Sequence, residues 1–319
     1  MTFVYVEKEV QTHPRTLKVL EKLKPSHVIP IDRYPEIFNR KNQHFRLQKK
    51  QASFILAKKH GTLVYPTPPG YGIGAKHNYY FSHFLNCPFD CRYCFLQGMY
   101  RSASFVLFVN FEEFQEEIKE KMGEDKATFF SGYDGDSLAM DAKTGFLSAF
   151  LPFFRKHPNA ELELRTKSVF IRELLKQPPF PNCVVAFSLS PQPLIQELEK
   201  KTPPLVKRLE AIQKLQEAGW KIGLRFDPII DCDNFEYHYT HFFEKVFDVV
   251  DETLLHSVSL GAFRLPKPVM KEIKRLKPND SLLAINQEGP RIQEKLRFCH
   301  EKLLNYFDKR KLFVCAEEF

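Results

Sequence analysis

The middle of the chain alternates between two hydrophobic patterns. Short apolar runs rich in Phe, Val and Leu alternate with longer segments in which apolar residues recur every three or four positions. The first pattern is typical of buried strands and the second of amphipathic helices. The predicted strands are 77–85, 104–110, 127–132, 161–167, 182–190, 220–230 and 254–263, and the predicted helices include 111–122, 144–157 and 168–177.

One further helix is predicted from its end signals. Thr202 is expected to cap its amino terminus, Pro203 to take the first helical position, and Gly219 to end it. Strand and helix therefore alternate from about residue 77 to about residue 262. Parallel strands need such crossovers, which predicts an α/β fold with strands buried on both faces. A barrel, a partial barrel and a doubly wound sheet fit the pattern equally well.

The chain divides into three predicted parts. A turn-rich joint at residues 65–74, YPTPPGYGIG, separates an amino-terminal extension of residues 1–75 from an α/β core of residues 76–265. Residues 266–319 form a predicted carboxyl-terminal helical extension. In an α/β core, ligands bind in the loops at the carboxyl ends of the strands, so the side chains there are the candidates for function.

Charge is concentrated in two places. The chain has 319 residues and a net charge of +8. Basic residues are interleaved with Phe45 and Phe54 at residues 40–59, and a second basic cluster spans residues 264–277. Each cluster fits either a surface that neutralises a phosphate backbone or a solvated face of a helix or loop. The excess of positive charge makes DNA or another nucleic acid the expected partner.

The sequence also predicts a compartment. It contains no apolar run long enough to span a membrane, and its start, MTFVYVEKEVQTH, lacks the basic-then-apolar order of a secretory signal. We therefore expect a cytoplasmic protein without a membrane partner. The odd number of cysteines, seven, argues against a disulfide framework. Four of them are scattered and are expected to be small buried hydrophobes: Cys183, Cys232, Cys299 and Cys315.

The other three cysteines form a compact motif. Cys87, Cys91 and Cys94 lie within NCPFDCRYCFLQG, just after the first predicted core strand. Two metal sites fit this spacing. His83 and the three cysteines could bind zinc as four ligands. Alternatively, the cysteines could hold three irons of an iron–sulfur cube and leave its fourth iron open to a substrate or cofactor.

The motif resembles the signature of the radical S-adenosylmethionine (SAM) enzymes. The spacing Cys87-x3-Cys91-x2-Cys94, with the aromatic Tyr93 before the last cysteine, carries the resemblance. It implies a [4Fe-4S] cluster whose open iron binds SAM, and reductive cleavage of SAM to a 5′-deoxyadenosyl radical. It also implies an electron donor such as a flavodoxin or ferredoxin.

A wider set of motifs resembles the spore photoproduct lyase family. These motifs are CRYCFLQ, DGDSLAMD at 134–141, RTKS at 165–168, AFSLSPQ at 186–192, RLEAIQKLQEAGWKIGLRFDPII at 208–230 and FRLPKP at 263–268. The resemblance implies a partial parallel β/α barrel and repair of ultraviolet-damaged thymine pairs in DNA without light.

The same resemblance assigns roles to residues. Lys167 and Ser188 match positions that contact SAM, Asp136 and Ser137 lie in a loop that approaches it, and Tyr93 packs on its adenine. Each side chain also has a structural alternative. Lys167 could reach solvent, Ser188 could satisfy a neighbouring backbone group, and Asp136 and Ser137 could cap a helix.

Three further residues have two interpretations each. Asp227 could hold a ribose or an arginine, or could only start a turn after its strand. Arg225 and Arg264 could neutralise phosphate or form salt bridges with carboxylates.

The chain departs from the family at three places. Tyr133 stands where the lyases have a cysteine that returns a hydrogen atom to the product, and Phe95 replaces a tyrosine after the last cluster cysteine. Residues 279–289, NDSLLAINQEG, lack the aromatic and basic residues of the lesion-binding hairpin. Tyr133 and Tyr93 are therefore the candidate catalytic residues, with Tyr133 as the hydrogen donor.

Three functions follow from these observations. The first is a radical SAM lyase acting on a pyrimidine photolesion in nucleic acid. The second keeps the radical chemistry but has a different, non-lesion substrate. The third is a non-catalytic nucleic-acid-binding protein stabilised by zinc.

Overall fold

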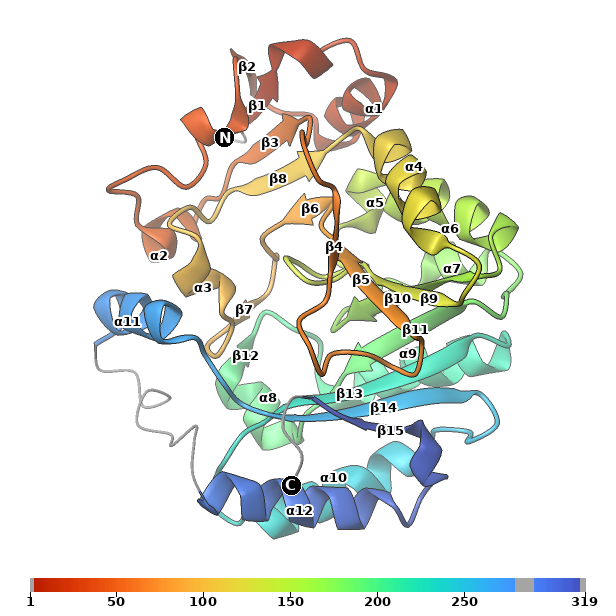
Figure 1. Cartoon of the computed structure of the whole chain (residues 1–319). Coiled ribbons are helices and arrows are strands. Elements are labelled where there is room, and N and C mark those ends of the chain that lie inside the picture. Colours follow the sequence, from red (N-terminus) through yellow and green to blue (C-terminus); the bar gives the residue numbers. More distant parts are fainter. Residues whose placement is uncertain (1–2, 279–289, 316–319) are drawn as a thin grey trace.

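Two β-sheets of different size and a short ribbon organise the chain (Figure 1). The computed structural model describes residues 3–278 and 290–315. The larger sheet has eight strands in the order β15-β14-β13-β11-β10-β9-β5-β4, the smaller has five in the order β2-β1-β3-β8-β6, and β7 and β12 form the ribbon.

The larger sheet is the predicted α/β core. From β5 to β15 its neighbouring strands pair in parallel and follow one another along the chain, and only the edge strand β4 is antiparallel. Edge strands β4 and β15 are not neighbours, so the barrel is partial. Its strands are β4 (Val64–Pro66), β5 (His77–Phe81), β9 (Ala127–Phe130), β10 (Ala160–Thr166), β11 (Cys183–Ser188), β13 (Lys221–Ile229), β14 (Leu255–Ala262) and β15 (Leu312–Val314).

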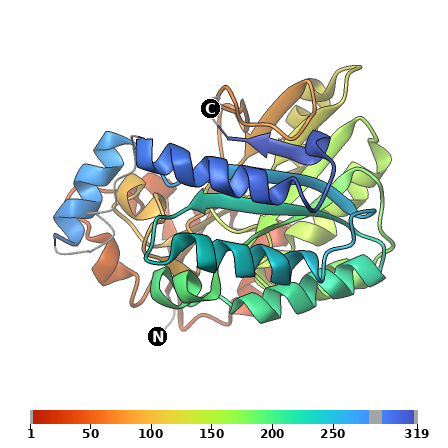
Figure 2. The same ribbon diagram turned by 90° about the horizontal axis from the view of Figure 1, so that it is seen from below.

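Helices make the crossovers between these strands. Figures 1 and 2 show α10 and α12 covering the end of the molecule where β13, β14 and β15 lie. Their apolar stripes face the sheet, as the helical spacing predicts. The helices are α3 (Leu96–Met99), α4 (Phe111–Met122), α5 (Asp141–Thr144), α6 (Phe146–Lys156), α7 (Arg172–Leu175), α8 (Gln192–Leu198), α9 (Leu205–Glu217), α10 (Phe235–Phe247), α11 (Lys267–Leu276) and α12 (Pro290–Leu303).

The smaller sheet corrects one prediction. The strand expected at 104–110 is present as β8 (Phe105–Phe108), but it pairs with β3 and β6 instead of joining the barrel. The other members of this sheet are β1 (Phe3–Glu7), β2 (His27–Ile31), β3 (Phe54–Ala57) and β6 (Phe84–Leu85), and helices α1 (Pro14–Leu23) and α2 (Phe45–Gln48) accompany them. A strand's periodicity does not say which sheet it joins.

The boundaries predicted at residues 75 and 265 do not separate the sheets. Strand β4, before residue 75, belongs to the larger sheet, whereas β6 and β8, after residue 75, belong to the smaller one. The segment after residue 265 supplies two helices and also strand β15, which pairs with β14. Residues 279–289 lie outside the described residues.

The predicted start of the 202–219 helix is also wrong. Helix α9 begins at Leu205, three residues later than the expected cap. The hydroxyl of Thr202 instead donates to the carbonyl of Glu199 at 2.8 Å and accepts from Arg208. Two consecutive prolines, at 203 and 204, delay the helix, because the residue before a proline is pushed out of the helical region.

A buried ion pair crosses the interior of the barrel. The guanidinium of Arg225 on β13 lies 2.6 Å from Glu163 Oε2 on β10, and both side chains are almost fully buried. Arg225 also donates to the hydroxyl and carbonyl oxygens of Ser257 on β14. Arg225 therefore forms a salt bridge with a carboxylate, which is one of the two roles predicted for it.

This pair predicts an effect on stability. Arg225→Met should lower the free energy of unfolding by about 3–5 kcal/mol, because Glu163 would stay buried without a counter-charge. The double variant Arg225→Met/Glu163→Met should regain most of this loss, and urea unfolding measures both. A single variant as stable as the double variant would contradict the prediction.

Candidate functional site

The three clustered cysteines lie on one short loop that the fold holds at both ends. Cys87 follows β6, and Cys91 lies in β7 (Asp90–Cys91), which pairs with β12 (Glu199–Lys200). The amide of Cys94 donates to the carbonyl of Cys91 at 3.1 Å, so the chain turns directly into α3. These contacts bring all three thiols to the wall of one small cavity.

Asn86 makes the turn that starts this loop. Its φ of +69° is in the left-handed region, which asparagine tolerates better than most residues. Its buried side-chain amide donates to the carbonyls of Ser102 and Ser104, at 3.0 and 2.7 Å. The loop is thereby tied to the segment that leads into β8.

Helix α2 covers the cysteine cavity from the other side. Phe45 and Lys49 line the cavity, and the Lys49 ammonium donates to the carbonyl of Cys87. Arg46 forms a two-pronged salt bridge with Asp90, with its second hydrogen bond at 3.0 Å. Burial alone would raise the pKa of Asp90, but Arg46, Lys49 and Lys277 together hold it below its ordinary value.

His83 does not join the cysteines, so it does not supply the fourth ligand of the zinc alternative. Its ring stacks on Phe146 with the centroids 3.8 Å apart, among other phenylalanines of the core. Burial lowers its pKa to about 3, so the imidazole is neutral. Within residues 3–278 and 290–315, no three His, Cys, Asp or Glu side chains are arranged to hold a single metal ion. A zinc ion needs four donors that converge on one point.

A buried carboxylate, Glu199, connects the cysteine loop to the barrel. It accepts a hydrogen bond from the Tyr93 hydroxyl, and Arg208 Nη2 lies 2.5 Å from its second oxygen. The ammonium of Lys167 lies 3.9 Å from Glu199 and 5.6 Å from the centre of the Tyr93 ring. Burial alone would raise the pKa of Glu199, but the cations Lys167 and Arg208 lower it overall.

The structure brings Lys167 and Ser188 to this network. Lys167 directly follows β10, and its mostly buried side chain reaches Glu199 instead of solvent. Ser188 is the last residue of β11, and its carbonyl accepts from Arg208 Nη1 at 2.9 Å. Both residues therefore lie at the carboxyl ends of barrel strands, close to Tyr93.

Asp136 and Ser137 organise the loop after β9. Asp136 accepts from the backbone amides of Leu138 and Ala139, and its second oxygen accepts from the Lys167 amide at 2.7 Å. These bonds resemble a helix cap, although the helix predicted there does not begin before α5 at Asp141. The hydroxyl of Ser137 is buried and lies 2.8 Å from that of Ser131. The loop is thus fixed against the end of β10.

The structure places Tyr133 beside the cysteine loop. Its ring is half-exposed, stacks on Tyr80 with the centroids 4.4 Å apart, and lies 5.8 Å from the ring of Phe95. Phe95 is the residue directly after Cys94. Tyr133 and Phe95, two of the three departures predicted from the resemblance, therefore face each other in space.

Two arginines mark the remaining strand ends. Arg165 donates to Asp227 at 2.9 Å, so Asp227 holds an arginine, one of its predicted roles. Arg264 donates to the carbonyl of Cys315 at 3.1 Å, just after β15. Lys167, Ser188 and Arg264 therefore lie at or just after the carboxyl ends of barrel strands.

The sequence analysis missed four residues of this site: Arg46, Lys49, Glu199 and Arg208. The sequence does contain a signal for Arg208. It lies three residues after Leu205 and one before Leu209, on the apolar stripe of its helix. A cation on the buried face of a helix needs a buried partner. No comparable sequence pattern indicated Glu199, Arg46 or Lys49.

A family model and several curated relatives match this chain. The family model is described as "Spore photoproduct lyase" and matches residues 76–312. The spore photoproduct lyase of Bacillus subtilis (strain 168) is 28% identical over 203 residues, which are 61% of this chain and 59% of the relative. The enzyme of the same name from Geobacillus sp. (strain Y412MC61) is 26% identical over 203 residues, with the same coverage. The match thus spans about 59% of the length of these relatives.

The fold is similar to that of solved spore photoproduct lyases. A structure described as spore photoproduct lyase complexed with dinucleoside spore photoproduct superposes with a TM-score of 0.81 at 18% identity. A variant with bound AdoMet and dinucleoside spore photoproduct gives a TM-score of 0.81 at 17% identity. Each comparison covers 99% of this chain and 98% of the other. At this identity the likeness confirms the fold, including the partial barrel.

The contact between Tyr93 and Glu199 predicts a second effect on stability. Tyr93→Phe should lower the free energy of unfolding of the metal-free chain by about 1–3 kcal/mol, because a buried carboxylate would lose a donor. The matched control is Tyr237→Phe, at a ring that is 61% exposed. We expect the control to change stability by less than about 0.5 kcal/mol in urea unfolding. Equal effects of the two substitutions would contradict the prediction.

Proposed function

This chain belongs to the spore photoproduct lyase family, and on that premise we propose that it is a radical SAM lyase that acts on a pyrimidine photolesion in DNA. The observation that carries the proposal is the cavity between the motif loop and residues 45–49, whose wall holds all three motif cysteines. Family membership comes from the match over residues 76–312.

The donor set of the three cysteines suits an iron–sulfur cube. Cys87, Cys91 and Cys94 are free thiols, and burial raises the pKa of each. A cube takes one thiolate at each of three irons, so its ligands need not converge on one point as those of zinc must. These residues would hold a [4Fe-4S] cluster, which with bound SAM supplies a 5′-deoxyadenosyl radical on one-electron reduction.

The neighbouring side chains suit SAM. The Lys167 ammonium offers a cation for the SAM carboxylate. Ser188 and the fixed loop at Asp136 and Ser137 border the same strand ends, and the Tyr93 ring offers an aromatic face for adenine. Glu199 orients Lys167 and Tyr93 together, because it contacts both. Closed packing around the loop would keep water away from a reactive radical.

The substrate class is supported by the family. Solved structures with the same fold are described as complexes with dinucleoside spore photoproduct. We also propose a cytoplasmic location and a flavodoxin or ferredoxin as the electron donor. Among the described residues, no helix is long and apolar enough to cross a membrane.

We assign the hydrogen donation that closes the reaction to Tyr133. Its hydroxyl would give a hydrogen atom to the carbon radical of the product, so that a C–H bond forms, the O–H bond breaks and a tyrosyl radical remains. The half-exposed ring at the strand ends supports this role, as does its stacking on Tyr80. Phe95, the neighbouring ring on the other side, has no hydrogen to pass on by such a step.

One observation favours a second candidate function. The loop from β9 to α5 contains no cysteine, and Phe95 stands beside Tyr133 where the family has a tyrosine. These changes alter the residues nearest the expected substrate while the cysteine motif remains complete. A radical SAM enzyme with a non-lesion substrate is therefore the alternative.

Formation of 5′-deoxyadenosine tests the proposal. Reconstituted, dithionite-reduced protein should be brown, contain acid-labile sulfide and cleave SAM, with clear stimulation by ultraviolet-irradiated DNA over intact DNA. Cys87→Ala should lose the colour and the cleavage, whereas Cys299→Ala, on α12, should keep both. Cleavage that is indifferent to irradiation would favour the alternative substrate, and equimolar zinc without colour would refute radical chemistry.

The role of Tyr133 predicts an uncoupled variant. Tyr133→Phe should still form 5′-deoxyadenosine with irradiated DNA but should yield no repaired thymine, because the phenol O–H is lost while the ring is kept. Tyr80→Phe removes the hydroxyl of the stacked neighbour and is the matched control, expected to repair normally. Chromatography of digested DNA measures the product. Normal repair by Tyr133→Phe would rule out this hydrogen donor.

A further inference from the structure

Two short segments hold the positive charge of the whole molecule. Residues 40–50 and 267–277 together contain ten Lys or Arg residues and one carboxylate, Glu272, whereas the entire chain has a net charge of +8. The rest of the chain is therefore close to neutral. The segments are more than two hundred residues apart in sequence, so their positions in space decide whether the charges act together.

The fold places both segments on the same side of the molecule. In Figures 1 and 2, α2 and α11 lie at one edge, with α3 and the cysteine loop between them and the barrel. Helix α11 packs closely on α3, because a Cβ added at Gly98 would lie 2.5 Å from the Val269 carbonyl and would also crowd Ile273. Only glycine permits this approach.

The first of these segments borders the cysteine cavity directly. Phe45 and Lys49 of the first segment form part of its wall, and Arg46 binds Asp90 between the cysteines. Lys277 of the second segment lies near the same carboxylate. The opposite side of the loop faces Glu199, Lys167 and the strand ends, where SAM and substrate are proposed to bind. The first segment thus forms the wall of the cavity that lies away from the strand ends.

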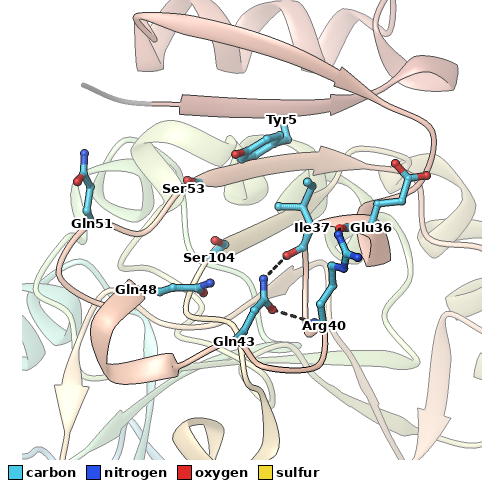
Figure 3. A pocket seen from close by; sticks show the side chains of 9 residues that line it. All are labelled: Tyr5, Glu36, Ile37, Arg40, Gln43, Gln48, Gln51, Ser53 and Ser104. Carbon is cyan, nitrogen blue, oxygen red and sulfur yellow. Dashed lines mark hydrogen bonds between the residues drawn. The ribbon is translucent and has the colours of Figure 1, made fainter.

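Glutamine side chains fix the first segment in place. Figure 3 shows Gln43 donating to the Ile37 carbonyl and accepting from the Arg40 amide, at 2.7 and 2.8 Å. Gln48 accepts from Ser102 and Ala103, each at 3.0 Å, which ties α2 to the segment after α3. The basic residues therefore stand on a preorganised support, which lowers the entropy cost of binding a partner.

The exposed side chains of these neighbouring elements include cations and two large apolar residues. Leu47 on α2 is 64% exposed and Met99 on α3 is 43% exposed, unusual values for such side chains. We call this surface the basic face and define it by its exposed cations, Arg40, Lys41, Lys50, Lys267, Lys271 and Lys274. Methionine and apolar side chains inside a charged rim are typical of protein interfaces, whereas phosphate backbones need only the cations.

We infer that the basic face is the docking surface for a small acidic one-electron carrier protein. The inference rests on the proposed function, since only a redox cluster behind α2 needs such a partner. One electron leaves the reduced carrier and enters the cluster, and no atom or proton is transferred. Charge complementarity would steer the encounter, and a small, transient interface suits a carrier that must leave again.

Charge reversal on α11 tests the inference. The variant Lys271→Glu/Lys274→Glu changes two exposed side chains, and Lys119→Glu/Lys121→Glu on α4 is the matched control. The probe is a purified acidic flavodoxin in its fully reduced form, mixed in a stopped-flow instrument with the holoenzyme. At low salt, we expect cluster bleaching in the α11 variant to be at least about tenfold slower than in the native chain, with the control unchanged. At high salt the difference should shrink, because the charges are screened.

Dithionite separates this inference from the proposed function. Being a small molecule, dithionite needs no docking surface, so the α11 variant should cleave SAM with it at the native rate. Native dithionite-driven cleavage together with native reduction by flavodoxin would overturn the inference alone. Unchanged reduction by flavodoxin with weakened binding of irradiated duplex DNA would assign the basic face to nucleic acid and also overturn it. A native chain that never assembles a cluster would overturn the proposed function and this inference with it.

Discussion

The site depends on the contacts of one buried carboxylate, that of Glu199. A bare carboxylate away from water is costly, and this one is retained because Tyr93, Arg208 and Lys167 all surround it. Tyr93 comes from the cysteine loop, Arg208 from α9 and Lys167 from the end of β10. One charge thereby fixes the loop, a crossover helix and a barrel strand relative to one another. Tyr93 and Lys167 are positioned because this charge must be neutralised.

The amino-terminal segment completes the site from outside the barrel. A three-cysteine loop with two short flanking strands has little structure of its own, and α2 supplies the missing wall through Arg46 and Lys49. Exposed cations flank the same helix at Arg40, Lys41 and Lys50. Residues 40–50 are therefore a structural part of the cysteine site as well as a surface that a partner can use. These two roles of residues 40–50 explain why so much of the net charge is concentrated close to the cysteine loop.

The sequence-based interpretation succeeded where local patterns carry the information. Alternating strand and helix periods predicted the parallel core from β5 to β14, and the Cys87-x3-Cys91-x2-Cys94 spacing located the loop at the first strand's carboxyl end. It failed where pairing across the chain decides the outcome. Strand β8 joins the smaller sheet, β15 joins the larger one, and His83 lies in an aromatic core instead of beside the cysteines. Apolar residues at every second position indicate that a segment is a strand, but its partner strand depends on long-range packing.

By itself, the sequence determined the element types, the cysteine motif and the excess of positive charge, because each is a property of neighbouring residues. Only the tertiary structure decided which distant groups meet. It paired Glu199 with Tyr93 and Arg208, placed Tyr133 against Phe95, and brought residues 40–50 and 267–277 to the same side of the cysteine cavity. The physical reason is that burial forces polar groups to find partners wherever the packed fold places them, and sequence separation does not limit that choice.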